Sequence, residues 1–277
     1  TPRVITVTSD SEDGEGVADT GDKVTITGEN FGTDPSDISV SFNGTPAEFE
    51  LVDESTIVAT TPADYQTGSV TVTIHGYTMT GGAMFNPNSK GDVTVLYLQN
   101  YKQPFAKAND ESWKNGEWWT PAVWNQNAAS FNAKGNTTVS GMQYKSEEGL
   151  TLAFQNGWDK EAYTDGKMWQ VATLRPGRYR LEVTYAYTLV VTDAGNFISV
   201  LIAKGDSESD IPNVSDLEQL NGVYVAYDKM GTANDSGTLV TPSFEVTETT
   251  DVVIGFLTSL AKGNSYFKVT ELKLILE

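Results

Sequence analysis

Apolar and polar residues alternate with a period of two along several short segments of this chain. The clearest of these segments are residues 24–27, 38–42 and 70–74. This alternation is typical of strands that bury one face. Turn-forming residues separate the segments, among them Asn43-Gly44, where two residues that tolerate positive φ predict a hairpin. Short strands spaced by roughly 8–12 residues predict a β-sandwich rather than a βαβ sheet.

The later part of the chain continues the β pattern over longer distances. Strands are expected at residues 93–98, 150–154, 168–174, 179–187, 197–203, 223–227, 239–246, 252–257 and 266–276. These strands, with long early loops, fit a jelly-roll sandwich. The tyrosines of the fourth segment, including Tyr179 and Tyr187, are expected on one face. A shift of the apolar pattern at Thr270-Glu271 predicts a β-bulge.

Other segments interrupt the strands. Residues 99–149 are the least regular, with a short helix expected within 121–129, and residues 206–220 read as an acidic surface loop. A polar, turn-rich break at residues 86–91 marks a domain boundary. The chain is therefore expected to be all-β, with one domain at residues 1–87 and a larger one at residues 92–277.

Charge and composition exclude several classes of function. The formal net charge of −19 argues against nucleic acid and against an anionic membrane surface, because both attract clustered Lys and Arg. It is compatible with a neutral ligand and equally with solubility alone. The absence of cysteine excludes disulfides, and a single histidine, His75, rules out multi-histidine metal sites.

Two further features concern the membrane and the beginning of the chain. No apolar run approaches the about 18 residues that span a bilayer, so no direct membrane insertion is expected. The chain begins with neither Met nor a signal peptide. We expect a mature form, from which a secretion signal and a lipid-anchoring cysteine have been removed.

Four of the six tryptophans fall close together, at Trp113, Trp118, Trp119 and Trp124. Glycine, proline and asparagine in this stretch predict a loop. Aromatic faces on loops can stack on the C–H groups of a sugar, and amides or carboxylates bind its hydroxyls. The nearby polar side chains are Asn115, Glu117, Asn125, Gln126 and Asn127. The alternative is that the rings fill a core. Trp118 and Trp119 should point to opposite sides of an extended chain.

A second group of candidate ligand-binding residues follows. Asn156, Trp158 and Tyr163 lie in or beside a predicted turn, with Trp169 and Gln170 on the next strand. Trp169 is expected in the core because it alternates with Met168 within that strand. The sequence contains none of the nucleophile-elbow, phosphate-loop or dinucleotide-binding motifs, so no catalytic role is expected.

The first 87 residues resemble an IPT/TIG domain, which has an immunoglobulin-like fold. The matching residues are Gly21-Asp-Lys-Val-Thr-Ile-Thr-Gly-Glu-Asn-Phe-Gly32, Ile38-Ser-Val-Ser-Phe-Asn-Gly44, Thr56-Ile-Val-Ala-Thr-Thr-Pro62 and Gly68-Ser-Val-Thr-Val-Thr-Ile74. The resemblance implies an immunoglobulin-like sandwich with Val24 and Ile26 facing inward and Phe31 at its end. Such domains serve as spacers, dimerisers or interaction modules.

The remainder resembles the C-terminal β-sandwich of Bacteroidetes surface lipoproteins, a galactose-binding-like jelly roll. The matching residues are Asn156-Gly-Trp158, Asp165-Gly-Lys-Met-Trp-Gln170, Leu174-Arg-Pro-Gly-Arg-Tyr-Arg-Leu181 and Phe267-Lys-Val-Thr-Glu-Leu-Lys-Leu274. Jelly rolls of this type often carry one structural calcium ion, which Asp110, Glu111 and Glu271 could hold. No other cofactor is implied.

Together the two resemblances imply a surface glycan-binding protein of a polysaccharide-utilisation system. The expectation is a non-enzymatic protein on the outer membrane, with the TIG domain as a spacer and the jelly roll binding a neutral polysaccharide or oligosaccharide. Proteins of an outer-membrane transport complex are possible partners. The competing expectation is a structural or protein-interaction module, such as an adhesin segment, which would bury its tryptophans and bind no glycan.

Overall fold

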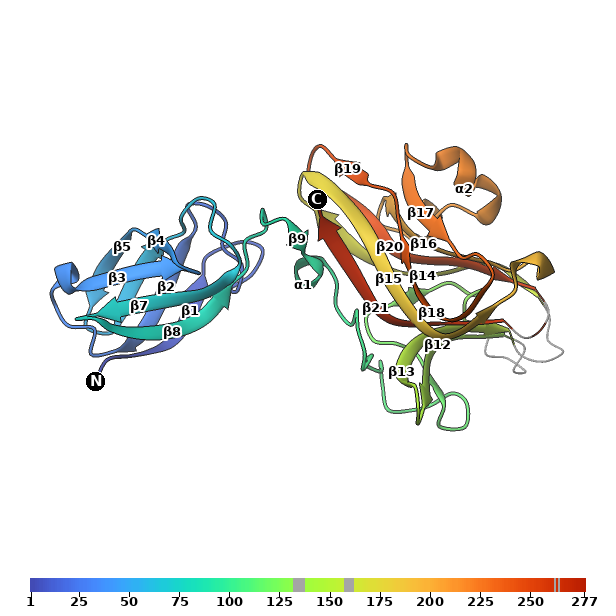
Figure 1. The fold of residues 1–277 in the computed structure, drawn as a ribbon, viewed down its shortest axis with the longest axis horizontal. Helices are drawn as coiled ribbons and strands as arrows, with labels where there is room; N and C mark the ends of the chain where they lie inside the picture. The colour runs from blue at the N-terminus through green and yellow to red at the C-terminus, as the bar shows by residue number, and fades with distance from the viewer. Residues whose placement is uncertain (132–137, 157–161, 262, 264) are drawn as a thin grey trace. The chain divides into compact units, whose positions relative to one another are not determined.

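The computed structural model describes residues 1–277 except 132–137, 157–161, 262 and 264. The chain divides into two compact units, Thr1–Lys90 and Gly91–Glu277. The boundary lies inside the break at residues 86–91. Both units are built from antiparallel sheets, so the all-β expectation is confirmed (Figure 1).

The smaller unit is a sandwich of two four-stranded sheets, ordered β1-β2-β6-β5 and β4-β3-β7-β8. Its strands are β1 (Arg3–Ser9), β2 (Lys23–Glu29), β3 (Ile38–Phe42), β4 (Thr45–Ala47), β5 (Phe49–Asp53), β6 (Thr56–Thr60), β7 (Gly68–Ile74) and β8 (Tyr77–Met84), with a 3-10 turn at Pro35–Asp37. One core joins the sheets and includes Ile26 of β2 and Val72 of β7. Phe31 is buried in that core, as expected.

The predicted hairpin in this unit is present. Strands β3 and β4 pair directly, with Phe42 opposite Thr45. The two residues between them, Asn43 and Gly44, have φ of 45° and 86°. Two consecutive positive φ angles are the geometry that lets a two-residue loop follow the twist of its strands.

The larger unit contains an eight-stranded and a five-stranded sheet. The first is ordered β10-β12-β13-β21-β15-β18, with β19 on β15 and β9 on β21. Its strands are β9 (Gly91–Asp92), β10 (Trp118–Trp119), β12 (Thr138–Lys145), β13 (Gly149–Asn156), β15 (Gly177–Val190), β18 (Ala233–Val240), β19 (Phe244–Val246) and β21 (Tyr266–Leu276). The second sheet, ordered β11-β14-β20-β16-β17, comprises β11 (Asn125–Gln126), β14 (Tyr163–Leu174), β16 (Phe197–Lys204), β17 (Val225–Lys229) and β20 (Thr250–Leu260).

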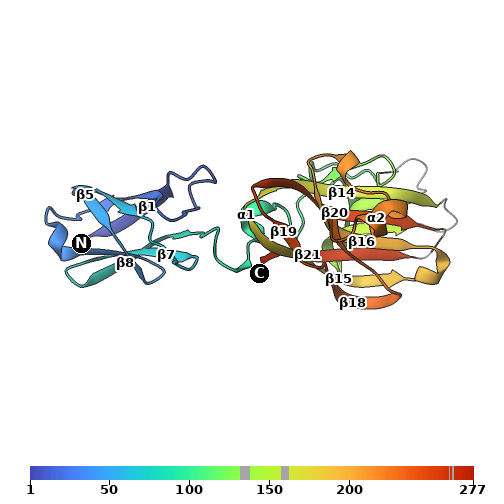
Figure 2. The ribbon, with the colours of Figure 1, turned by 90° about the horizontal axis from the view of Figure 1, so that it is seen from above.

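The inner faces of these sheets meet in an aromatic core. The ring centre of Phe154 on β13 lies 4.9 Å from that of Phe256 on β20 and 5.9 Å from that of Phe267 on β21. All three side chains are fully buried. Figure 2 shows the strands of the two layers from above. The larger unit is thus the sandwich that the strand pattern predicts.

The predicted bulge on the last strand is confirmed by the pairing of β21 with β15. Thr184 faces Glu271, but the next residue, Tyr185, faces Val269. Thr270 is therefore an extra residue on β21. This explains why the apolar pattern of the sequence changes phase at that point.

Three local predictions in this unit are wrong. Residues 93–98 form helix α1 (Thr94–Tyr97) instead of a strand, because Asp92 accepts the Thr94 backbone N–H at 3.0 Å and turns the chain. Residues 239–246 are split between β18 and β19, since Pro242 has no N–H to continue a ladder. Residues 121–129 contain no helix, because Asn125 and Gln126 pair with β14.

Residues 206–220 also differ from the expected surface loop. They contain a 3-10 turn (Glu208–Asp210) and helix α2 (Val214–Leu220), which lies beside β17 in Figure 1. Ile211 and Leu217 are buried against the outer face of the five-stranded sheet. The ammonium of Lys167 donates to the Ile211 carbonyl at 2.7 Å. This segment therefore covers part of one face of the sandwich.

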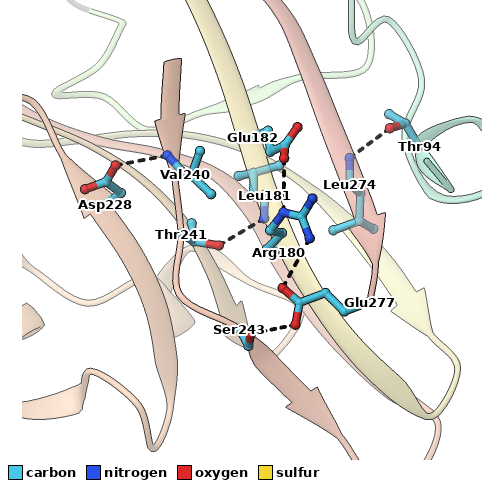
Figure 3. Close-up of polar contacts among 10 residues, drawn as sticks. All are labelled: Thr94, Arg180, Leu181, Glu182, Asp228, Val240, Thr241, Ser243, Leu274 and Glu277. Atoms are coloured by element: carbon cyan, nitrogen blue, oxygen red, sulfur yellow. Dashed lines mark hydrogen bonds and ion pairs between the residues drawn. The ribbon is translucent and has the colours of Figure 1, made fainter. Parts of the chain in front are cut away.

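Polar contacts connect β15 and β21 to neighbouring parts of the larger unit (Figure 3). Arg180 donates to Glu182 at 3.0 Å and to Glu277 at 3.4 Å, and Ser243 donates to Glu277 at 2.7 Å. The Thr94 hydroxyl accepts the Leu274 N–H at 2.8 Å. These bonds tie the chain terminus and α1 to β15 and β21. Among the described residues, no helix is both long and apolar enough to cross a membrane.

Candidate functional site

The clustered tryptophans lie mostly in packed surroundings. Trp118 is 2% exposed, Trp124 5% and Trp119 7%. Trp118 pairs with Gln143 and Trp119 with Met142, so the two rings point to opposite faces, as expected. Trp118 packs with Trp113 on Ala153, and the ammonium of Lys107 lies 4.0 Å from the Trp119 ring centre. Neither ring has an open face for a sugar.

Trp124 is also occupied by its own neighbours. Its ring lies 5.8 Å from that of Phe256, and its indole N–H donates to the Asn100 carbonyl at 2.9 Å. Trp113 keeps partial exposure and meets the edge of Phe131 at 5.8 Å. The prediction that Trp118, Trp119 and Trp124 form a sugar platform is therefore replaced by a packing role, since a stacking ring needs an accessible face.

The second group of candidates is only partly described. Trp158 lies outside the described residues. Tyr163 is buried, and its hydroxyl hydrogen-bonds with the Thr258 hydroxyl at 2.8 Å. Burial raises the pKa of the Tyr163 phenol well above its usual value. Asn156 is buried and donates to the Ala261 carbonyl at 2.7 Å. Trp169 is buried on β14, as expected.

The expected calcium ligands do not form a cluster. Asp110 and Glu111 lie in the loop before β10, whereas Glu271 lies on β21. Within the described ranges, no group of three or more carboxylate or histidine side chains could hold a metal ion. Calcium requires six or more oxygen ligands, so the structure provides no basis for assigning it to these three residues.

The two outer faces of the larger sandwich differ in how they are covered. Residues 206–220 cover part of the outer face of the five-stranded sheet. The outer face of the eight-stranded sheet carries a pocket of about 460 Å³. Its lining residues are Lys145, Glu148, Gln155, Tyr187, Thr188, Asn234, Asp235, Tyr266 and Lys268. Its size and mixture of aromatic and polar side chains suit a small-molecule or oligosaccharide site.

Tyr187 reaches this pocket because of a bulge in β15. Tyr185 pairs with Gly237 and Thr188 with Asp235, so two residues of β15 oppose one of β18. Before the bulge, Tyr179 and Val183 are buried. Within it, Tyr187 is 41% exposed, and after it Val190 is buried. The expectation that Tyr187 shares a face with Tyr179 is therefore wrong.

Backbone strain accompanies this exposure. Tyr187 has φ of 50°, and Asp235 on the adjacent strand has φ of 88°. A bulky side chain in the left-handed region costs of order 1–3 kcal/mol, and such outliers cluster at functional sites. Both strained residues line the same pocket.

A buried ion pair forms part of the pocket. Lys268 donates a short hydrogen bond to Glu148, and their side chains are 4% and 18% exposed. The Lys268 ammonium also lies 5.4 Å from the centre of the Tyr266 ring. Burial lowers the pKa of Lys268, and the Glu148 carboxylate opposes that shift. The pair brings a charged donor and a charged acceptor to the pocket.

A second cavity, of about 510 Å³, lies beside α2. Its main polar groups are engaged within the protein. Lys167 donates to the carbonyls of Ile211 and Glu208. Asp210 accepts from Ser207 and Tyr224. Because these groups stabilise the covering segment, the pocket on the eight-stranded sheet is the better candidate ligand site.

Some site residues can be found from the sequence. Lys268 stands between Phe267 and Val269, and this alternation indicates that it faces away from the core. Tyr266 has the same parity as Lys268. Glu148, Asn234 and Asp235 carry no such signal because they lie in a turn and on an edge strand that are exposed in any register. Tyr187 cannot be found in this way, because the bulge in β15 moves its side chain off the face that the alternation predicts.

The geometry defines an all-β protein of two sandwiches, the larger one presenting an open sheet face lined by tyrosines. Residues 99–255 match the family model described as "Domain of unknown function (DUF5013)", and residues 14–89 match the IPT/TIG domain. Because the first match covers more than half of the chain, the protein belongs to the DUF5013 family, with an IPT/TIG domain preceding that region. No curated protein matches the chain in sequence.

Several solved structures are similar to the chain. SGBP-B from a complex xyloglucan utilization locus in Bacteroides uniformis has 13% identity and a TM-score of 0.27. The match covers 100% of this chain and 73% of the SGBP-B chain. TmCBM61, solved with beta-1,4-galactotriose, has 14% identity and a TM-score of 0.34, covering 65% of this chain and 100% of its own. At such TM-scores these similarities do not identify the ligand of this chain.

Proposed function

We propose that this protein binds a neutral polysaccharide without catalysis, through the outer face of its eight-stranded sheet. The observation that carries the proposal is the pocket in which Tyr187 and Tyr266 accompany hydrogen-bonding side chains. Tyrosine rings offer flat faces for the C–H groups of a sugar, while amides and charged groups bind its hydroxyls. The proposal thus assigns sugar stacking to these tyrosines and not to the buried tryptophans.

Charge supports a neutral ligand. The pocket is lined by two lysines, Lys145 and Lys268, and by two carboxylates, Glu148 and Asp235. This local balance lies within a chain of net charge −19. A polyanionic glycan would approach against that negative field, whereas an uncharged glycan would not be repelled.

The same residues support binding rather than hydrolysis. Glycoside hydrolysis uses two carboxyl groups about 5–9.5 Å apart across the scissile bond. In this pocket Glu148 is ion-paired with Lys268, and Asp235 is held on an edge strand of the sheet. These contacts suit recognition of a ligand. In this proposal the protein acts at the cell surface, and the IPT/TIG unit is a spacer.

The competing function is a structural or protein-interaction module, for example in a surface transport complex or an adhesin. The burial of Trp118, Trp119 and Trp124 favours it, because a module of that kind has no need of exposed rings. The two functions differ in their expected response to glycan.

Affinity electrophoresis separates them. Native gels would be cast with β-1,4-galactan, xyloglucan or mixed-linkage β-glucan. The unaltered chain, Tyr187→Ala, Tyr266→Ala and the control Tyr77→Ala would be run in each gel. Tyr77 is 54% exposed in the smaller unit. We expect at least one polysaccharide to retard the unaltered chain and Tyr77→Ala, but not the two pocket variants. If no polysaccharide retards any of the four proteins relative to a gel without polysaccharide, the interaction module is favoured.

A further inference from the structure

We infer that the Glu148–Lys268 pair determines specificity in this pocket, and that the sugar unit it selects is a neutral pyranose presenting two adjacent hydroxyl groups. This inference rests on the proposed function and adds the chemical class of the bound unit. It follows from the hydrogen-bonding capacity, the burial and the charge balance of the pair.

The Glu148–Lys268 pair retains unused hydrogen-bonding capacity. An ammonium group has three N–H donors, and a carboxylate has two oxygen acceptors. The recorded bond between Lys268 and Glu148 uses one N–H and one oxygen. Among the described residues, neither the Lys268 ammonium nor the Glu148 carboxylate makes a second side-chain hydrogen bond. A donor and an acceptor thus stand side by side next to the pocket.

Two adjacent sugar hydroxyls match this arrangement of donor and acceptor. Hydroxyl groups on neighbouring ring carbons lie about one hydrogen-bond length apart, and each can donate and accept. One hydroxyl can accept from the Lys268 ammonium while its neighbour donates to the Glu148 carboxylate. Hydrogen bonds to charged groups are the stronger kind. A single hydroxyl, or one blocked by an ether, would satisfy only half of the pair.

The pair and its surroundings are held in place before a ligand binds. The two side chains are already largely buried, and Lys268 lies beside the Tyr266 ring. Thr188 fixes the local strand, because its hydroxyl accepts the Lys268 backbone N–H at 3.0 Å. Groups held before binding lose little freedom when a ligand arrives. A sugar stacked on Tyr266 would meet the pair in a fixed position.

The charge balance of the pocket disfavours acidic sugars. The positive charge of Lys268 is balanced by Glu148, and Lys145 has a second carboxylate, Glu117, at 3.5 Å. Asp235 adds another negative charge to the lining. The carboxylate of a uronic acid would therefore find no unbalanced cation and would face repulsion.

The test compares four polysaccharides in native form by titration calorimetry: β-1,4-galactan, xyloglucan, mixed-linkage β-glucan and polygalacturonate. Variants Lys268→Met and Glu148→Gln remove one member of the pair each. Lys273→Met is the matched control, because Lys273 lies on the same strand, faces outward beside Glu271 and is outside the pocket lining. For the neutral polysaccharide that binds, we expect either pocket variant to weaken binding by about tenfold or more, since a charged hydrogen bond is lost.

A second comparison shows whether the variants act through ligand hydroxyls. The bound polysaccharide would be O-methylated and titrated again. Methylation should weaken binding to the unaltered chain and to Lys273→Met by about tenfold or more, but should add little to the loss in Lys268→Met. Glu148→Gln conserves shape and provides the same comparison if Lys268→Met lowers the melting temperature.

The outcomes separate this inference from the proposed function. Binding that is lost in Tyr187→Ala but unchanged in both Lys268→Met and Glu148→Gln would overturn the inference and leave the proposed function standing. Polygalacturonate binding as tightly as the neutral polysaccharide would overturn it as well. If none of the neutral polysaccharides bound the unaltered chain, the proposed function would fail and this inference with it.

Discussion

Tyr187 occupies a backbone conformation that large side chains rarely adopt, with φ of 50°. The neighbouring residues show what this conformation achieves. The ring centres of Tyr185 and Phe267 lie 5.6 Å apart, whereas Tyr187, two residues later, is exposed beside the pocket. A regular strand would have placed both tyrosines on the core side. At the scale of single residues, a local irregularity thus converts a core position into a surface one.

Buried tyrosines give a prediction for alkaline pH. Burial raises the pKa of Tyr65, Tyr163 and Tyr179 above the ordinary phenol value. The stability that each buried phenol contributes is therefore complete below about pH 10, which is the phenol pKa in the unfolded chain. It is lost as the pH rises toward the higher pKa of the phenol in the folded protein. The free energy of unfolding, measured in urea, should fall progressively above about pH 10.

One substitution tests the cause of this decline. Tyr163→Phe removes the phenol and its bond to Thr258. It should cost about 1 kcal/mol at neutral pH and make the alkaline fall less steep. Tyr77→Phe, at an exposed position, should leave the curve unchanged. An alkaline slope of Tyr163→Phe equal to that of the unaltered chain would show that this phenol is not responsible.

At the scale of elements, strands β14 and β20 approach so closely that only glycine fits between them. A Cβ on Gly255 would lie 2.1 Å from the Met168 carbonyl oxygen and 2.8 Å from the Trp169 Cα. Both atoms belong to backbone, so the strands themselves would have to separate. This contact joins the central strand β20 to the strand that carries Trp169.

Gly255→Ala should therefore destabilise the larger unit by about 3 kcal/mol, at the upper end of overpacking costs. Gly231→Ala is the matched control, because its Cβ would meet nothing within 4 Å. It should change stability by less than about 0.5 kcal/mol. Chemical denaturation of both variants measures the difference, and equal midpoints would contradict the close approach of the strands.

Elements that depend on local pattern could be predicted, and those that depend on pairing could not. The alternation around Val72 and Phe267 identifies β7 and β21 because each strand has one face in a core. Residues 206–220 look like a surface loop because Ile211 and Leu217 stand among acidic and serine residues. Their burial depends on the sheet beneath them. In the same way, Trp118 and Trp119 show a binding pattern in sequence, but tertiary contacts cover them: Trp113 and Ala153 pack on Trp118, and Lys107 lies over the Trp119 ring.

At the scale of the whole molecule, the division into two compact units predicts independent folding. Each unit has its own core and its own complete sheets. A fragment of residues 91–277 should unfold cooperatively on its own. If the IPT/TIG unit is only a spacer, this fragment should bind the polysaccharide with an affinity within about twofold of that of the full chain. A much larger loss of affinity would show that the smaller unit contributes to binding.

The central claim is that the tyrosine-lined pocket of the eight-stranded sheet binds a neutral polysaccharide. The most direct measurement is titration calorimetry of the full chain with β-1,4-galactan, xyloglucan and mixed-linkage β-glucan, repeated with Tyr187→Ala, Tyr266→Ala and Tyr77→Ala at matched melting temperatures. The account predicts saturable binding to at least one polysaccharide, retained by Tyr77→Ala and weakened about tenfold or more by each pocket variant. Binding that survives both pocket substitutions unchanged, or no binding to any of the three, would contradict it.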